Sequence, residues 1–462
     1  MVNKLKNFTF KILTRWFSGE SIDYKQVIAI FLPVLIDQAF VICLNLLNTA
    51  MISTSGVAAV SAVNMVDSLN IFLINVFVAL ATGGTVVVAQ YKGSGNEKMV
   101  SKSAAGTIGS VFLLALAIGV TIIIFHDQIL GLLFGKAAPD VFANAKIYII
   151  GSCASYCGIG TVESVCGALR GIGETRSSLI MSLTMNLSYV FFNFIFINTL
   201  HMGIYGMVIS INIARYLAAA LAILYVVRLG NNLRVQFIDI IKFDFSMLKR
   251  IFFIGLPFAA EQMFFNGGKI LTQTFIVSLG TYAIDTNAIA GSMAALSQIP
   301  ANAMSLTIVT VVGQCMGRRD VKDARKFVKS FVTASSISFI LMSMIIFPLY
   351  YPIVSLFHPP AEIVPDILSI LIINAIAQTL LWSAAFITPS ALRAAGDSRF
   401  TSIMAMLSMW FFRVVMGYVL GIILHLGVNG VWLAMDLEWA VRGIIFMSRF
   451  RGKKWYKHHV ID

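Results

Sequence analysis

Charge is scarce in this sequence of 462 residues. Only 12% of the residues are Asp, Glu, Lys or Arg, 58% are hydrophobic, and the mean hydropathy is +0.86. Ordinary soluble domains carry about a quarter charged residues, so the composition excludes that class of protein. The uncharged blocks run to about twenty residues or more, the length that a helix needs to cross a bilayer core of about 30 Å. The sequence therefore predicts an all-α polytopic membrane protein.

Cysteine and catalytic motifs are also scarce. The five cysteines stand in apolar segments, without the spacing of a disulfide framework or a zinc site, and we interpret them as small packing residues. No phosphate-binding loop, GxSxG elbow or HExxH motif occurs in the sequence. We therefore expect neither an enzyme nor a cofactor, and we do not expect this chain to hydrolyse ATP.

Positive charge is present, with a formal net charge of +13, but it does not indicate a nucleic-acid partner. Nearly all of the 34 Lys and Arg residues fall in alternate segments between the apolar runs, whereas Lys136 and Lys146 fall on the other side. The positive-inside rule then predicts twelve membrane spans with both termini in the cytoplasm. Two of these spans, for example, are expected over 59–82 and 286–312. The predicted organisation is a cytoplasmic N-terminal segment 1–26, an N-lobe 27–229, a cytoplasmic linker 230–247, a C-lobe 248–449 and a basic tail 450–462. The N-terminal segment has no signal pattern, and residues 8–17 are expected to form an interfacial amphipathic helix.

The two halves of the chain repeat one another at a nearly constant offset. Four strings recur in matching places: the first helix, the second-to-third loop, the fourth-to-fifth loop and the start of the sixth helix of each half. They are Pro33-x-x-x-Asp37-Gln38-x-Phe40 with Pro257-x-x-x-Glu261-Gln262-x-Phe264, Val87-Val88-x-Gln90-x-x-Gly93 with Val311-Val312-x-Gln314-x-x-Gly317, Ala168-Leu169-Arg170-x-x-Gly173 with Ala391-Leu392-Arg393-x-x-Gly396, and Leu200-His201-x-Gly203 with Leu424-His425-x-Gly427. This repeat predicts two pseudo-symmetric six-helix lobes with parallel orientation, an arrangement of secondary transporters that work by alternating access. A duplicated bundle with a scaffolding role is the alternative.

With these strings the sequence resembles the multidrug and toxic compound extrusion (MATE) family. The likeness rests on Pro33, the run Gly83–Gly93, Ala168–Gly171, Asn193–Ile197, Gly255–Pro257 and Gly430–Leu433. The resemblance implies two six-helix lobes that export drugs in exchange for H⁺ or Na⁺, in a bacterial inner membrane. The chain departs from the family at coupling positions, with Asn48-Thr49 in place of Asp-Thr, Phe265 in place of Glu and Trp382 in place of Asp.

Two carboxylates are the main candidates for ion coupling, because charges at bilayer depth are costly and by default functional. Asp37 and Glu261 are equivalent repeat positions, each four residues past a proline, Pro33 or Pro257, that we expect to act as a helix hinge. A buried carboxyl can load and release a proton near neutral pH. Helical spacing places Asn45 and Asn48 on the same face as Asp37. With Asn193 these residues form the expected coupling set, in which Asp37 and Asn193 are candidate ligands for Na⁺; interhelical hydrogen bonding is the alternative.

Several ion pairs within the membrane are left open. Glu261 has Lys269 and Arg413 as candidate countercharges, and a standing ion pair would make it structural. Glu438 and Arg442 have the i, i+4 spacing of an intrahelical pair. Arg215 has two candidate partners, Asp67 and Glu163.

The expected function is secondary active multidrug efflux by a monomer, which exchanges H⁺ or Na⁺ for small organic cations. Methionine and aromatic side chains suit flat, lipophilic cations. The predicted substrate cleft contains Gln38, Gln262, Asn266, Trp382 and Met409. The rival hypothesis is a flippase for a lipid-linked saccharide, although such proteins favour cationic clefts and often have two more helices. A channel or a receptor is disfavoured by the duplicated proline–acid motif.

Overall fold

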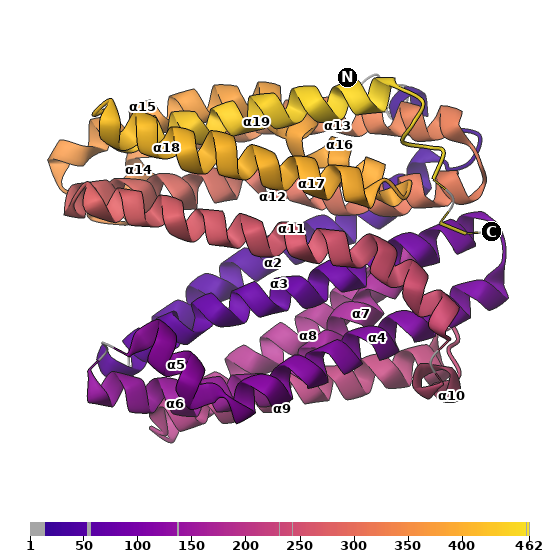
Figure 1. Cartoon of the computed structure of the whole chain (residues 1–462), viewed down its shortest axis with the longest axis horizontal. Coiled ribbons are helices and arrows are strands. Elements are labelled where there is room, and N and C mark those ends of the chain that lie inside the picture. Colours follow the sequence, from indigo (N-terminus) through magenta and orange to yellow (C-terminus); the bar gives the residue numbers. More distant parts are fainter. Residues whose placement is uncertain are drawn as a thin grey trace, which may run out of the picture. The chain divides into compact units, whose positions relative to one another are not determined.

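The computed structural model describes residues 14–52, 57–135, 138–230, 232–242, 244–458 and 460–461, with side chains except those of 45–52 and 57. All regular secondary structure in these residues is helical, and Figure 1 follows the helices along the chain. The N-terminal half contains α2 (Tyr24–Ile52), α3 (Val57–Gly93), α4 (Glu97–Ile124), α5 (His126–Phe134), α6 (Pro139–Ala154), α7 (Tyr156–Ile172), α8 (Thr175–Asn193), η2 (Phe194–Thr199), α9 (Gly203–Leu224), η3 (Tyr225–Leu229) and α10 (Phe237–Ile241). The C-terminal half contains α11 (Phe245–Ser278), α12 (Thr281–Gly317), α13 (Val321–Ile346), α14 (Tyr350–Ser355), η4 (Ala361–Ile363), α15 (Val364–Ala377), η5 (Gln378–Trp382), α16 (Ser383–Ala394), α17 (Ser398–Ser408), η6 (Met409–Val415), α18 (Met416–Tyr418), η7 (Val419–Ile423) and α19 (Gly427–Arg451).

The helices account for the predicted number of spans. Within the described ranges, 9 helical segments are long and apolar enough to cross a membrane, and α6 with α7, bent by 43°, brings the number to 10. The two remaining long helices, α11 and α19, carry Glu261 and Lys269, and Asp436, Glu438 and Arg442, respectively. These charges lower their hydropathy, yet α11 and α19 occupy the places of the seventh and twelfth predicted spans.

Several helices are longer than the sequence predicts. The helix α3 has 37 residues, about 55 Å at 1.5 Å per residue, and runs through the Val87–Gly93 string that we expected in a loop. The equivalent string lies in α12, and Arg170 and Arg393 lie in the last turns of α7 and α16. The loop assignment was wrong because glycines in membrane helices permit close packing rather than ending the helix. A Cβ at Gly84 would overlap the Thr107 side chain on α4.

The chain divides into two compact units. The N unit is Leu32–Ala259, and the C unit combines Met1–Phe31 with Ala260–Asp462. The boundaries fall inside α2 and α11, close to Pro33 and Pro257, so the N-terminal part of each of these helices belongs to a different unit from the rest.

The backbone reproduces the sequence repeat within each unit. A glycine with positive φ follows both α7 and α16: Gly173 at 92° directly after α7, and Gly396 at 97° one residue past the Ala395 cap of α16. In both caps the glycine N–H donates to the arginine carbonyl, Arg170 or Arg393, at 2.9 Å. The repeated histidines His201 and His425 also share a left-handed backbone, with φ of 51° and 55°. A non-glycine residue rarely adopts this conformation, so the repeat extends to local geometry.

Small residues bring the N-unit helices together. The helix α7, buried along most of its length, packs against α3, α4, α8 and α9. Gly167 on α7 leaves room for Thr85 on α3, whose hydroxyl donates to the Gly167 carbonyl at 2.9 Å. In the C unit, α12 packs against α13, α15 and α16, and α16 packs against α19.

Two smaller predictions have mixed outcomes. Cys153, Cys166 and Cys315 are buried, as expected for packing residues, and Cys157 is half-buried, but Cys43 is exposed. The interfacial helix predicted over 8–17 lies outside the described residues except for 14–17, which are helical. This described end packs on α13 of the C unit, where the Phe17 and Phe331 rings lie 5.3 Å apart.

Candidate functional site

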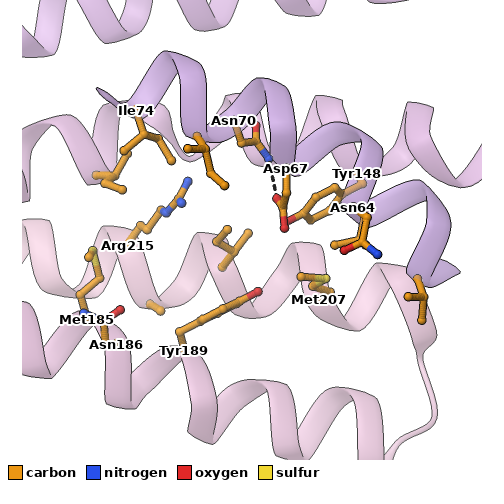
Figure 2. A pocket seen from close by; sticks show the side chains of 16 residues that line it. Asn64, Asp67, Asn70, Ile74, Tyr148, Met185, Asn186, Tyr189, Met207 and Arg215 are labelled. Carbon is orange, nitrogen blue, oxygen red and sulfur yellow. Dashed lines mark hydrogen bonds between the residues drawn. The ribbon is translucent and has the colours of Figure 1, made fainter. Parts of the chain in front are cut away.

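A polar cavity of about 460 Å³ lies among the helices of the N unit. Its walls come from α3, α6, α7, α8 and α9, and Figure 2 shows Asp67 and Asn70 facing Tyr189 and Arg215 across it. Asp67 on α3 is its carboxylate, and this carboxylate accepts hydrogen bonds from the Tyr148 hydroxyl at 2.8 Å and the Asn70 amide at 3.1 Å.

This carboxylate belongs to a hydrogen-bonded network. The Asn70 carbonyl oxygen accepts from the Tyr156 hydroxyl at 2.7 Å and from the Ser152 hydroxyl at 3.0 Å. On the opposite wall, the Arg215 guanidinium donates to the Ser155 hydroxyl at 2.7 Å, at the bend between α6 and α7. Arg215 attracts both of its candidate partners, Asp67 and Glu163, and only Asp67 lines the cavity with it.

Asp37 lies in a second acidic group of the N unit. The half-buried Asp37 carboxylate lies near the Ser182 side chain on α8, and Arg170 at the end of α7 is its neighbouring cation. The Oδ1 atom of Asp37 is buried and has no hydrogen-bond partner in the described part of the chain. Arg170 also approaches Glu163 at 3.9 Å, and Glu163 in turn acts on Asp37. Two carboxylates therefore share this one arginine.

Glu261, the repeat equivalent of Asp37, has different surroundings. Its side chain is 4% exposed and accepts hydrogen bonds from Arg393 at 2.9 Å, Arg442 at 3.1 Å and the Ser402 hydroxyl at 3.0 Å. Lys269 and Arg413 were the wrong countercharges, because Glu261 is held by arginines from α16 and α19.

A second buried carboxylate completes this network. Glu438 pairs with Arg442 at 3.4 Å, which confirms the i, i+4 pair, and with Arg413 at 3.0 Å. Three arginines therefore hold two carboxylates in the C unit. The repeat thus preserves the pairing of a first-helix acid with a fourth-helix arginine, but the balance of charge around that pair is opposite in the two units.

Other predicted coupling residues do not join Asp37. Asn193 is buried at the end of α8, near the Tyr189 hydroxyl. Asp37 meets α8 at Ser182, eleven residues earlier and about 16 Å away along the helix. A sodium ion held jointly by Asp37 and Asn193 does not fit this arrangement. The side chains of Asn45 and Asn48 lie outside the described residues.

The predicted cleft residues divide into two sets. Trp382 is 3% exposed and packs against Phe386 and Phe339, with ring centroids 4.7 and 5.4 Å away, and Met409 is fully buried. These two side chains are therefore packed inside the C unit in this structure. The half-buried residues are Gln38, Gln262 and Asn266. Pro33 and Pro257 lie inside uninterrupted helices.

Most residues of the N-unit cavity were not predicted from the sequence. Asp67 and Arg215 were predicted only as an open pair, and Asn70, Tyr148 and Tyr189 were not selected. A signal was present on α3, where Asp67, Asn70 and Ile74 have i, i+3 and i+7 spacing and so share one face.

Comparison with known proteins identifies the family. The MatE family model matches residues 33–195 and again residues 257–419. The chain belongs to the MatE family. The two matches begin at Pro33 and Pro257, which are equivalent repeat positions, so the MatE model reproduces the internal repeat and the resemblance is confirmed.

Relatives of this MatE chain cover almost its full length. It is 25% identical over 428 residues to the uncharacterized transporter YisQ of Bacillus subtilis, covering 92% of this chain and 93% of the relative. It is 24% identical to the probable multidrug resistance protein NorM of Thermotoga maritima, covering 95% and 94%. Among solved structures, an outward-facing multidrug resistance MATE family transporter has a TM-score of 0.84 at 19% identity, covering 95% and 96%. A MATE crystal structure in complex with MaL6 has a TM-score of 0.85 at 18% identity, covering 92% and 95%. These likenesses establish the two-lobe MATE fold.

Proposed function

We propose that this chain is a secondary active exporter that exchanges H⁺ or Na⁺ for amphipathic organic compounds, including organic cations. The lobes 27–229 and 248–449 would alternate access to the two sides of a bacterial inner membrane, with both termini in the cytoplasm and the monomer as the working unit. The names of the relatives support multidrug transport, and the positive-inside pattern supports the orientation.

The observation that carries the proposal is the incomplete neutralisation of Asp37. This carboxylate shares Arg170 with Glu163, and one of its oxygens is buried without a hydrogen-bond partner in the described residues. A buried carboxylate without full compensation is costly, so it gains free energy when it binds a proton or a metal cation. Asp37 is thereby suited to load and release a coupling ion.

Ion binding at Asp37 would couple to the conformation through the helices that it joins. Asp37 lies near Ser182 on α8, and it lies four residues past Pro33 on α2. Neutralising the carboxylate removes its attraction to Arg170 and its ability to attract the Ser182 hydroxyl. A coupling ion drives exchange only if it binds the two conformations with different affinities. The affinities differ if Asp37 lies close to α8 in one conformation and not in the other.

Glu261 has a different role in this mechanism. Two arginines and a serine already satisfy its carboxylate, so a coupling ion would have to displace two guanidinium groups. We therefore assign Glu261 to the framework of the C unit, and we assign coupling to Asp37.

The test is ethidium transport into and out of proteoliposomes under an imposed pH or Na⁺ gradient. Asp37→Asn should reduce gradient-driven transport to the protein-free level, whereas ethidium affinity of the purified variant should stay within a few-fold of wild type. Asp67→Asn is the matched control, since it neutralises a second, likewise half-buried aspartate of the N unit, whose Oδ1 atom already accepts hydrogen bonds from both Tyr148 and Asn70. Gradient-driven transport at the wild-type rate in Asp37→Asn contradicts the coupling assignment. If no organic compound moves under either gradient, a lipid-linked saccharide becomes the next substrate to test.

A further inference from the structure

The C unit contains a second cavity, of about 410 Å³, formed by α11, α12, η6 and α19. Two basic side chains line it, Lys269 from α11 and Arg413 from η6. Trp432 supplies an aromatic wall, and its indole N–H donates to the Asn287 side-chain oxygen at 3.0 Å, which fixes the ring. The remaining described lining residues are polar amides, a threonine and small or apolar side chains, with no carboxylate among them.

This cavity is the repeat equivalent of the cavity in the N unit. When the halves are aligned so that Pro33 matches Pro257, lining positions of the two cavities coincide. Examples are Ile74 with Gln298 and Ile211 with Met435. The same alignment places Gly291 where the N unit has Asp67, and Arg413 where it has Tyr189. Each cavity therefore has one guanidinium, although at different positions of the repeat, because Trp439 stands where the N unit has Arg215. The carboxylate is present only in the N unit.

Lys269 is the second cation of this cavity, beside Arg413. Lys269 is the repeat equivalent of Asn45, so a lysine replaces an amide at this position of the first helix of the half. The Lys269 ammonium lies 4.8 Å from the centroid of the Phe265 ring. No carboxylate of the described residues lies within ion-pair distance of it; Glu438 attracts it from further away but is bound by Arg413 and Arg442.

The positive charge of Lys269 at this cavity is not paired with a carboxylate of the described residues. A lysine at membrane depth is costly unless an anion or water compensates it. Asp436 also acts on Arg413, but it does not line the cavity, and both its oxygens are buried without hydrogen-bond partners in the described part of the chain. In the N unit, Asp67 on α3 supplies a carboxylate to the cavity. The equivalent position on α12 is Gly291, which supplies none.

We propose that this cavity binds the carboxylate of an amphipathic organic substrate, with the Lys269 ammonium as its partner, Arg413 beside it and Trp432 against the apolar body. This cavity then extends the proposed substrates to organic anions and zwitterions that carry an aromatic or aliphatic body. This inference rests on the proposed export function and specifies its substrates. A cavity of this volume lies within the range of about 300–1,000 Å³ that accommodates small organic ligands.

The test is direct binding of 2-naphthoate to the full-length protein in nanodiscs of neutral lipid, measured by calorimetry. Its neutral isostere 2-naphthamide is the matched ligand. Loss of a charged hydrogen-bond partner costs roughly a tenfold to a hundredfold in affinity, so Lys269→Met should weaken 2-naphthoate by that factor. Lys269→Arg should stay within about threefold of wild type, and Lys454→Met, an exposed lysine of the C-terminal tail, should leave binding unchanged.

Each outcome decides the proposal. The proposal is supported if Lys269→Met is the only variant that lowers the affinity for 2-naphthoate, and if wild type binds 2-naphthamide more weakly than 2-naphthoate. Equal binding of the two ligands, or wild-type affinity in Lys269→Met, overturns it. If phosphatidylglycerol nanodiscs abolish 2-naphthoate binding, a lipid headgroup occupies the cavity, and the substrate assignment is also overturned. Should Lys269→Met not fold, the comparison of the two ligands in wild type decides. The binding assay applies no gradient, so its result can be interpreted even if ion-coupled transport fails. In the same way, the transport assay can be interpreted even if 2-naphthoate does not bind.

Discussion

Glu261→Gln should destabilise the protein strongly, although the substitution changes few atoms. The Glu261 side chain is 4% exposed and holds Arg393 and Arg442 at 2.9 and 3.1 Å. A neutral amide leaves three buried arginines with Glu438 as their remaining bound carboxylate. Removing one partner from a buried ion pair costs about 3–5 kcal/mol. For a unit of about 200 residues, this corresponds to a fall in Tm of roughly 6–20 °C.

The matched control is Asp37→Asn, the same chemical change at the equivalent repeat position. Asp37 shares its arginine with Glu163, so neutralising it removes a repulsion as well as an attraction. We expect its stability to stay within about 1 kcal/mol of wild type. The assay is thermal unfolding of the purified proteins in the same detergent at neutral pH, followed by reaction of the buried cysteines with a thiol-reactive dye.

A double variant separates charge from packing. Combining Glu261→Gln with Arg393→Gln removes one guanidinium that the first substitution leaves uncompensated, so the pair should be more stable than the sum of the single effects predicts. If Glu261→Gln unfolds within a degree or two of wild type, the arginines do not depend on Glu261. The reasoning that makes Glu261 structural would then be refuted, and Glu261 would again be a candidate ion carrier.

Two further predictions concern packing and pH. Gly167→Val should destabilise by about 1–3 kcal/mol in the same assay, because a Cβ there would lie 2.9 Å from the Thr85 hydroxyl, whereas Gly131→Ala, with nothing within 4 Å, should be neutral or stabilising. Burial opposes ionisation of Asp320, but hydrogen bonds from the Asp323 N–H and the Ser21 hydroxyl prevail and lower its pKa below 3.8. Because the folded pKa is the lower one, the charge stabilises above about pH 4 and this contribution is lost as the pH falls through the folded pKa. Asp320→Asn should therefore unfold more easily than wild type at pH 7, with a difference of about 1 kcal/mol or less that vanishes in acid, and equal stability at pH 7 would contradict this.

Sequence alone predicted the architecture of this protein well. Spans of about twenty apolar residues have few other uses, and the duplicated strings define the two halves without any knowledge of their packing. The caps at Gly173 and Gly396 follow from the same repeat, because a positive φ is encoded locally by glycine. Helix ends were predicted less well, since Gly83 and Gly84 look like breakers in sequence but permit close helix packing in a membrane.

The polar chemistry required the tertiary structure. In sequence, Asp37 and Glu261 are indistinguishable: each follows a proline by four residues at the same place in its half. Their partners come from helices more than a hundred residues away, so no local pattern states that Arg170 is shared with Glu163 while Glu261 holds two arginines. Likewise, the substitution of Gly291 for Asp67 gains meaning only when both positions line equivalent cavities. Hydropathy decides which segments enter the membrane, because it is a sum over neighbours in sequence. The charge balance at a buried site is a sum over neighbours in space, and folding alone determines it.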